Sequence, residues 1–468
     1  MTHARLIAAH AGTTGDPLQG KRIAVLGFAR QGRALARWLP TVGAQVAVSD
    51  GKTAEQLGIE PAAFPGVEFM LGGHPANLLD GVDVLCLSGG VPNDNPIVLE
   101  AVQRGITLTN DAQLFMERCP APVIGITGSA GKTTTTTLVG AMLKRAGLTT
   151  WVGGNIGDVL LDVLGQIRPN DRVVMELSSF QLELMTASPE IGAVLNITPN
   201  HLDRHGTMEA YAEAKARLLA YQDDSAAAIL GRDDAGSRAL EDCIAGRLAW
   251  FSMREMVADG AFLAGERLIL SGISSPDGGA HAFAERGDLK LRGEHNLANV
   301  LAACAITGAA GVKPEAMLDV IRAFRGVPHR MEIVRERGGV TFVNDSIATA
   351  PERVLAALRS YDEPLVLLLG GRDKKLPWEE MMTVALRKAR LIVAFGEAAD
   401  LVARVARAVG AEADQVVRAG VLDEALALAV KAAQPGDVVL LSPGGTSYDA
   451  YEDFAQRGEH FRQLVLAL

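Results

Sequence analysis

The chain has 468 residues, of which 48% are hydrophobic and 21% are charged. That balance is typical of a globular protein, and the length predicts about three domains. The net charge is −10, from 45 Lys and Arg against 55 Asp and Glu, which argues against the basic face of a nucleic-acid-binding protein. Four widely spaced cysteines form no CxxC pair, which argues against a structural zinc site or a disulfide scaffold.

The first 20 residues form a polar tail without the apolar core of a signal peptide. No stretch approaches the 18 consecutive apolar residues that span a bilayer. We therefore expect a cytoplasmic protein with no membrane partner.

From residue 22 onwards, short apolar runs that often end in glycine alternate with helical stretches. The predicted strands are, in chain order, 22–27, 45–49, 82–88, 123–127, 172–176, 191–196, 226–230, 364–371, 391–396 and 437–445. The predicted helices are 33–39, 138–145 and 294–311, and a β-rich segment is expected at 250–290. Strands that alternate with helices indicate parallel sheets with right-handed crossovers.

A Pro-rich break at 119–122 and the segment around 325–330 divide this pattern into three sections. We predict an α/β fold with three domains. The first is a Rossmann-like domain over 1–119, the second a central P-loop domain with a mainly parallel sheet over 120–326, and the third a Rossmann-like domain over 327–468. Ligands of such open sheets bind outside the carboxyl ends of the strands.

The strongest local motif is Gly125-Ile-Thr-Gly-Ser-Ala-Gly-Lys-Thr-Thr134, between an apolar strand and a helical segment. Its glycines let backbone N–H groups turn toward a phosphate, Lys132 would reach the terminal phosphates, and the Thr133 hydroxyl would hold Mg²⁺. Ile126 stands where the usual pattern has its first glycine. The alternative is a tight turn with an incidental lysine. The predicted ATP-binding residues of the loop are Gly128, Ser129, Ala130, Gly131, Lys132, Thr133 and Thr134.

Two further features bear on nucleotide binding. Glu176 ends an apolar strand, so beside a phosphate loop its carboxylate would bind Mg²⁺; alone it would be a surface glutamate. The segment Gly27-Phe-Ala-Arg-Gln-Gly32, followed by Asp50, resembles a dinucleotide fingerprint whose middle glycine is replaced by Ala29. Nicotinamide binding is therefore a weaker alternative for the first section.

Four segments together are similar to the Mur ligase family of ATP-dependent amide-forming enzymes. They are Thr127–Thr134, Glu176–Glu183, Asn196–His205 and Gly293–Asn299, and the resemblance covers roughly residues 22–465. The string ELSSFQLE and the C-terminal SPGGTSYD resemble the members that join D-glutamate to UDP-N-acetylmuramoyl-L-alanine. The resemblance implies a ligase of peptidoglycan precursor synthesis that forms an acyl phosphate from ATP, and a first domain that binds a uridine nucleotide. We expect the protein to be a monomer.

The resemblance also implies two Mg²⁺ ions. Lys132, Thr133 and Glu176 would serve the first ion. His201 and a carbamylated Lys215 would serve the second. The candidate catalytic residues are Lys132, Glu176, His201 and Lys215. Asn200 stands where the family commonly has Asp, which removes one negative charge near the metals.

The remaining roles follow from the same resemblance. Asn296 and Asn299, three residues apart on one helix, would contact adenine, Arg330 the ATP phosphates, and Asp345 the ribose. The predicted substrate residues are Phe28, Ala29, Arg30, Asp50, Lys52 and Gly90 for the uridine nucleotide, Asn155 for the muramoyl group, and Thr349, Lys374, Ser447, Tyr448 and Phe454 for glutamate. Lys375 is an alternative to Lys374, and Ile347 replaces a common lysine, which leaves D- or L-glutamate open.

Three other functions stay open at this point. A related amide ligase, such as a folylpolyglutamate synthase, would use another acceptor or amino acid. A nicotinamide-dependent oxidoreductase would use the segment 22–50. A non-catalytic nucleotide-binding regulator would not need Lys132, Glu176, His201 and Lys215, all of which are present.

Overall fold

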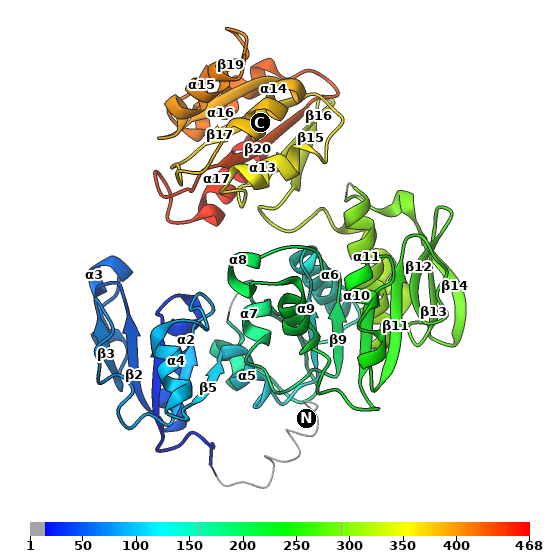
Figure 1. Cartoon of the computed structure of the whole chain (residues 1–468). Coiled ribbons are helices and arrows are strands. Elements are labelled where there is room, and N and C mark those ends of the chain that lie inside the picture. Colours follow the sequence, from blue (N-terminus) through cyan, green and yellow to red (C-terminus); the bar gives the residue numbers. More distant parts are fainter. Residues whose placement is uncertain (1–14, 158, 292) are drawn as a thin grey trace. The chain divides into compact units, whose positions relative to one another are not determined.

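The computed structural model describes residues 15–157, 159–291 and 293–468 (Figure 1). Residues 1–14, most of the predicted tail, lie outside the described residues. The chain divides into two compact units: one holds the residues up to Leu289 together with Glu294–Ala323, and the other holds Lys290–Gly293 together with Phe324–Leu468. Three mainly parallel sheets confirm the predicted α/β fold. The predicted domain boundaries stay predictions.

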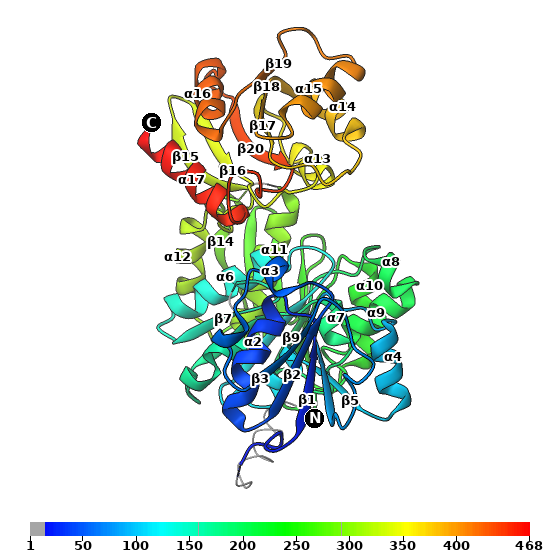
Figure 2. The same ribbon diagram turned by 90° about the vertical axis from the view of Figure 1, so that its left-hand side faces the viewer.

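The first sheet has five parallel strands in the order β3-β2-β1-β4-β5. Its strands are β1 (Arg22–Leu26), β2 (Gln45–Asp50), β3 (Val67–Leu71), β4 (Val84–Leu87) and β5 (Thr107–Asn110), and its helices are α2 (Arg30–Trp38), α3 (Ala54–Leu57), α4 (Pro96–Gln103) and α5 (Asp111–Met116). Successive side chains of a strand point to opposite faces. Ile23 and Val25 therefore join one core cluster, whereas Ala24 and Leu26 join another with residues of α4. Figure 2 turns this sheet toward the viewer.

The second sheet has nine strands in the order β14-β13-β12-β11-β10-β9-β6-β8-β7. Its strands are β6 (Val123–Thr127), β7 (Thr150–Gly154), β8 (Arg172–Glu176), β9 (Ile191–Val194), β10 (Ala227–Gly231), β11 (Arg247–Ser252), β12 (Gly260–Ala264), β13 (Arg267–Gly272) and β14 (Gly278–Glu285). Within this sheet, the described strands pair in parallel except for β12 with β13 and β13 with β14, which are antiparallel. They account for the β-rich segment expected at 250–290.

The helices of this part of the chain are α6 (Lys132–Arg145), α7 (Ser179–Leu182), α8 (Leu202–His205), α9 (Met208–Ala216), α10 (Ala235–Arg238), α11 (Glu294–Ala309) and α12 (Pro314–Ala323). Helix α6 begins six residues before the predicted helix 138–145. The run Thr133–Thr137 conceals its start in the sequence, because β-branched residues have low helix propensity.

One hydrophobic core joins the first two sheets. Residues of α5, such as Phe115, belong to the same buried cluster as Val25 of β1 and Val173 of β8. The Asn110 side chain donates to the backbone carbonyl of Gln181 (2.8 Å), so a buried polar link accompanies the apolar contact. This shared core explains why both sheets fall within one compact unit.

The third sheet has six strands in the order β15-β16-β20-β17-β18-β19, and only β15 is antiparallel to its neighbour among the described strands. Its strands are β15 (Glu332–Arg337), β16 (Val340–Asn344), β17 (Leu365–Gly370), β18 (Ala389–Phe395), β19 (Val416–Arg418) and β20 (Val438–Gly444), and its helices are α13 (Pro351–Leu358), α14 (Glu379–Lys388), α15 (Ala399–Ala408), α16 (Leu422–Ala432) and α17 (Phe454–Ala467).

Alternate residues of β17 face two separate cores. Leu365, Leu367 and Leu369 pack with residues of α13, α14 and α15, whereas Val366 and Leu368 pack with residues of α16 and α17. Helices therefore cover both faces, which is why the strand reads as a continuous apolar run. Within the described residues, no helix has the length and apolar character to cross a membrane.

Candidate active site

The predicted phosphate loop lies between β6 and α6. Gly128 (φ 157°) and Gly131 (φ 82°) adopt backbone conformations that favour glycine. A Cβ atom on Gly131 would lie 2.2 Å from Oδ1 of Asn299, so the close approach of α11 also requires glycine there. The Ala130 N–H donates to Oδ1 of Asn196 (2.8 Å), which fixes the tip of the loop.

Two lysine side chains contact the backbone of the phosphate loop. The ammonium groups of Lys132 and Lys215 both donate to the Gly128 carbonyl oxygen, at 2.8 Å and 3.0 Å. Lys215 is only 1% exposed. Its burial, and then the charge of Lys132, lower the pKa of Lys215 to about 7, while the charge of Glu176 acts in the opposite direction. The Lys132 cation and a second lysine amine that is partly uncharged near neutral pH thus lie beside a loop whose shape suits a phosphate.

Glu176 is buried at the end of β8, and each of its carboxylate oxygens accepts a hydrogen bond. Thr133 donates its hydroxyl to Oε2 (2.9 Å), and Asn155 donates its side-chain amide to Oε1 (3.0 Å). The fold therefore brings together Thr133, Asn155 and Glu176 from three separate segments. Carboxylate and hydroxyl oxygens are the ligands that Mg²⁺ prefers, so this donor set fits a magnesium ion beside the phosphate loop.

His201 lies in the loop after β9, where it has a positive φ of 54° and precedes α8. Its imidazole is exposed, and its ring centre lies 5.3 Å from that of Phe180. Among the described residues, no three His, Cys, Asp or Glu side chains form a metal-binding group. A second ion at His201 would therefore need Lys215 or another kind of ligand, and this role stays a prediction.

The two predicted adenine contacts are adjacent on α11. Asn299 is buried and donates its amide to Oδ1 of Asn296 (3.3 Å). Since Asn299 also approaches Gly131, these amides lie at the start of α6. The sequence predicted their shared helix face, and the structure adds their proximity to the loop.

The first sheet presents a second glycine turn after β1. Gly27 has a φ of 88°, and the Asp50 carboxylate accepts the backbone N–H groups of Phe28 (2.7 Å) and Lys52 (2.9 Å). The Phe28 side chain is fully buried among other phenylalanines, so only its backbone is available to a ligand. Ala29, by contrast, is exposed.

Arg30, at the start of α2, reaches the second sheet. Its guanidinium donates to the carbonyls of Gly154 (3.1 Å) and Gly157, on either side of Asn155. Arg30 was predicted to bind the uridine nucleotide and Asn155 the muramoyl group. Arg30 thus contacts the turn that carries Asn155. Gly90 lies in the exposed loop after β4.

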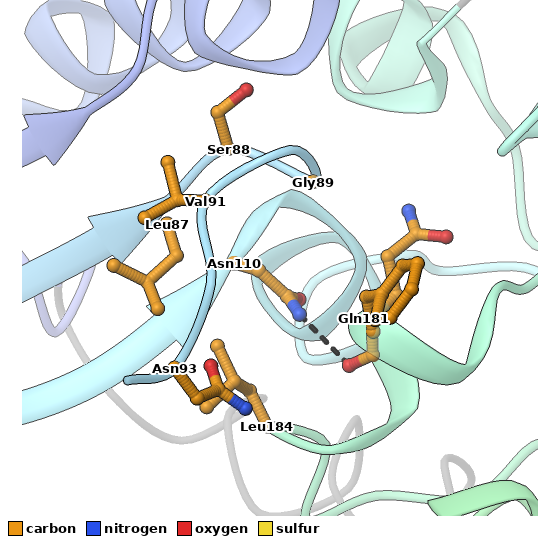
Figure 3. A pocket seen from close by; sticks show the side chains of 9 residues that line it. Leu87, Ser88, Gly89, Val91, Asn93, Asn110, Gln181 and Leu184 are labelled. Carbon is orange, nitrogen blue, oxygen red and sulfur yellow. Dashed lines mark hydrogen bonds between the residues drawn. The ribbon is translucent and has the colours of Figure 1, made fainter. Parts of the chain in front are cut away.

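A pocket opens beside that loop, between the end of β4 and helix α7 (Figure 3). The Ser88 hydroxyl is buried and has no hydrogen-bond partner among the described residues. The lining residues are Leu87, Ser88, Gly89, Val91, Asn93, Asn110, Phe180, Gln181 and Leu184. Sequence reasoning assigned none of them a role, although Phe180 and Gln181 lie within the ELSSFQLE string.

In the C-terminal unit, Asp345 follows β16 and is 4% exposed. Its Oδ2 accepts the Ser442 hydroxyl (2.8 Å), and its Oδ1 accepts the Met331 N–H (3.2 Å). Burial raises the pKa of Asp345 to about 7, while the bond from Ser442 and the charge of Arg330 act in the opposite direction. Arg330 lies between two residues with positive φ, His329 (64°) and Met331 (48°).

The predicted glutamate residues lie on loops at the carboxyl ends of the same sheet. The Lys374 ammonium donates to the Thr349 hydroxyl (3.1 Å), and burial lowers the pKa of Lys374. Ser447 is buried, whereas Tyr448 is 62% exposed. Phe454 begins α17, and its carbonyl accepts the Ser346 hydroxyl (2.8 Å).

Arg457 was not singled out by the sequence reasoning, yet its side chain lies at the centre of these loops. It is fully buried, and burial lowers its pKa to about 10. It donates to the carbonyl and hydroxyl of Ser346 (2.9 and 3.0 Å) and to the Gly445 carbonyl (3.3 Å). An arginine on an amphipathic helix gives no local signal that it will be buried.

Three family models match the chain. They are a Mur ligase MurD-like N-terminal domain at residues 21–110, a Mur ligase middle domain at 126–307, and a Mur ligase glutamate ligase domain at 329–445. They cover most of the chain in the order that the three sheets follow.

Curated relatives match almost end to end. A protein of Pelotomaculum thermopropionicum named UDP-N-acetylmuramoylalanine–D-glutamate ligase is 40% identical, over 96% of this chain and 98% of its own length. A protein of Desulfitobacterium hafniense with the same name is 38% identical over the same shares. The UDP-N-acetylmuramate-alanine ligase of Thermotoga maritima has a similar fold, with a TM-score of 0.57, 19% identity and coverage of 95% and 99% of the two chains.

Proposed function

The chain belongs to the Mur ligase family, and we propose that it joins D-glutamate to UDP-N-acetylmuramoyl-L-alanine with ATP, in peptidoglycan precursor synthesis. The observation that carries the proposal is the near end-to-end similarity to relatives that bear that ligase name. The dinucleotide-like segment 22–50 lies within the MurD-like match, which favours a uridine nucleotide over NAD.

In the proposed reaction, the phosphate loop and Lys132 receive ATP. ATP supplies the phosphoryl group that converts the acceptor carboxylate to an acyl phosphate, and Mg²⁺ offsets the negative charge of the reacting groups. Lys132 and the loop N–H groups hold the phosphates. Thr133 and Glu176 would hold a magnesium ion, since their oxygens lie together beside the loop. The glutamate amine then attacks the activated carbonyl, and phosphate leaves.

We propose a second ion at His201 and at a carbamylated Lys215. The surroundings of Lys215 support the modification: near neutral pH its lowered pKa leaves much of the amine uncharged, and the uncharged amine is the form that attacks CO₂. Carbamylation forms an N–C bond, releases a proton and converts a buried cation into an oxygen ligand. Mass spectrometry of the intact chain under CO₂ tests this, because the modification adds a carboxyl group that K215R cannot carry.

The other predicted residues keep their proposed roles. We assign Asn296 and Asn299 to adenine, Arg330 to the ATP phosphates and Asp345 to the ribose hydroxyls. Asp50 and Arg30 would hold the uridine nucleotide, and Asn155 the muramoyl group. For glutamate, Lys374 and Thr349 supply a cation and a hydroxyl that already contact each other. We further propose that the protein is a cytoplasmic monomer.

The decisive experiment measures phosphate release from ATP with UDP-N-acetylmuramoyl-L-alanine and either D-glutamate, L-glutamate or no amino acid. We expect release only with D-glutamate. Release with L-glutamate alone would keep the ligase chemistry but change the amino acid. No release with either would overturn the proposal and favour another acceptor, such as a folate.

A further inference from the structure

The pocket in Figure 3 has two walls that are far apart in sequence. One wall is the segment 88–95, here called the β4 loop, and the other is α7 with the residues that follow it. Side chains bridge the two walls. Asn93 donates its amide to Oε2 of Glu183, and Arg204 donates to the Val91 carbonyl (3.3 Å). The width of the pocket therefore depends on where Glu183 and Arg204 are held.

The His205 side chain contacts Glu183 and fixes its position. Its Nδ1 lies 2.9 Å from Oε1 of Glu183, and its Nε2 lies 2.9 Å from the Ser179 hydroxyl. The imidazole side chain is 1% exposed. Because both ring nitrogens are engaged, the imidazole cannot turn without breaking a buried hydrogen bond.

The same imidazole supports an aromatic wall of the pocket. It stacks on Phe180, with ring centres 5.2 Å apart and planes 5° from parallel, and its centre lies 5.0 Å from that of Tyr211. The Arg204 guanidinium lies 4.4 Å from the Phe180 ring centre. Phe180 lines the pocket, so its position in turn depends on His205.

The hydroxyl, imidazole and carboxylate of Ser179, His205 and Glu183 are connected in sequence, as in the catalytic triad of a hydrolase. The burial of these residues argues against a role of Ser179 as a nucleophile. Ser179 is 3% exposed in the first turn of α7, so its hydroxyl has little access to a substrate. A nucleophile must reach the reacting carbon of its substrate. The arrangement is better explained as a support for neighbouring side chains.

The place of the pocket in the fold points to its occupant. Ser88 directly follows β4, and β1 pairs with β2 on one side and β4 on the other, so the sheet order reverses beside this loop. Ligands of open α/β sheets bind at that reversal. Leu87, Val91 and Leu184 offer apolar contacts, while Asn93 and Gln181 bring side-chain amides to the same lining.

We propose that His205 is a positioning residue for the acceptor. It fixes Phe180 by stacking and the β4 loop through Glu183 and Asn93, and these two elements together form the surface against which an acylated sugar of the nucleotide-linked acceptor packs. The inference rests on the proposed function, since it assumes that the acceptor occupies this unit. His205 acts on acceptor binding and does not touch the reacting atoms.

The test compares variants of the full chain by steady-state kinetics and by calorimetric binding of UDP-N-acetylmuramoyl-L-alanine. His205→Phe keeps a flat ring and removes both hydrogen bonds; we expect the acceptor KM and Kd to rise about tenfold, with kcat within about threefold. His205→Gln, which can keep one bond, should recover part of the affinity. His281→Phe, at an exposed histidine of β14, is the matched control and should leave both constants unchanged.

Asn93→Ala tests the link to the β4 loop without disturbing the interior, because Asn93 is exposed. We expect the acceptor KM to rise about threefold in the wild-type background and to change little in the His205→Phe background. Additive effects of the two substitutions would show that His205 does not act through Asn93. If His205→Phe fails to fold, the acceptor KM and Kd of His205→Gln and of Asn93→Ala still test whether His205 positions the acceptor.

The outcomes separate this inference from the proposed function. If the wild-type protein binds the acceptor but shows no D-glutamate-dependent turnover, the proposed function fails while the binding data still test His205. If His205→Phe binds the acceptor as tightly as the wild type, or if only kcat falls, the inference is overturned. An equal rise in the ATP KM would likewise overturn it, because that would indicate general damage.

Discussion

The phosphate loop after β6 and the loops after β16, β17 and β20 both lie at carboxyl ends of parallel strands, yet they bury charges of opposite sign. The phosphate loop buries Lys215 beside Lys132, and the C-terminal unit buries Asp345 beside a serine hydroxyl. Burial moves both pKa values to about 7, downward for the lysine and upward for the aspartate. Each site thus holds an ionisable group that its protein surroundings only partly compensate.

The two sites differ in the polar and charged groups that surround the buried Lys215 and the buried Asp345. Lys215 has a carbonyl and a hydroxyl as direct partners, and the negative charge of the buried Glu176 acts on it. Asp345 has one hydroxyl and one backbone N–H, and the charges of Arg330 and Arg353 act on it. Such uncompensated charge destabilises the ligand-free fold. A buried group of this kind is therefore expected where a bound ligand supplies a hydrogen bond or an opposite charge. The two sites should differ in their response when single charged side chains are removed.

The largest effect is expected at Lys132. Lys132→Ala removes the cation that would hold the ATP phosphates, so kcat/KM for D-glutamate-dependent phosphate release should fall about 1000-fold. Lys144→Ala, at an exposed lysine in the last turn of the same helix, is the control and should change activity less than about twofold. Full turnover by Lys132→Ala would contradict the role of this loop.

Glu176→Gln keeps the shape of the side chain but removes its charge. The glutamine can still accept the Thr133 hydroxyl, whereas its affinity for Mg²⁺ should be weaker, so kcat should fall about 100-fold and the Mg²⁺ concentration for half-maximal activity should rise. Glu213→Gln, on the exposed side of α9, controls for the loss of one carboxylate. An unchanged Mg²⁺ dependence would place the ion elsewhere.

The pH response of the C-terminal unit tests the buried aspartate. Folded Asp345 keeps its proton up to about pH 7, while an unfolded aspartate loses it near 3.8. Between these values the folded state binds more protons, so stability falls as the pH rises through this window and levels off above pH 7. Asp345→Asn should remove this slope and stabilise the unit at pH 8, by at most about 4 kcal/mol.

Hydrogen exchange of peptides from β16 and β20, followed by mass spectrometry between pH 5 and pH 8 and corrected for the intrinsic exchange rate, measures this directly. The same peptides of the Asp345→Asn variant serve as the control, because that variant lacks only the titrating carboxyl group. A wild-type slope that persists in Asp345→Asn would show that another group titrates.

The smallest effect distinguishes two neighbouring lysines. Lys374 contacts Thr349, so Lys374→Ala should raise the KM for glutamate about tenfold with little change in the KM for ATP. Lys375→Ala should change the glutamate KM less than about twofold. Both lysines are exposed, but Lys375 has a positive φ of 58°. A larger effect at Lys375 would reverse the assignment.

Local sequence determined the strand pattern and the identity of most candidate residues. Apolar runs that end in glycine gave β1, β6, β17, β18 and β20 to within about two residues, because a strand covered on both faces must be apolar throughout. The phosphate loop was equally evident, since its glycines, lysine and threonine are consecutive. Helix α6 was only partly predicted, because a threonine run has little intrinsic helix preference and packing decides its conformation.

Only the tertiary structure decided which side chains meet. Lys215 reaches the Gly128 carbonyl across 87 positions of sequence, and Asn155 reaches Glu176 because β7 and β8 pair in one register. The fold likewise directed the Phe28 ring into the core and placed His205 between Ser179 and Glu183. Residue type and spacing specify which groups a segment offers, whereas crossovers and strand register determine the neighbours of those groups.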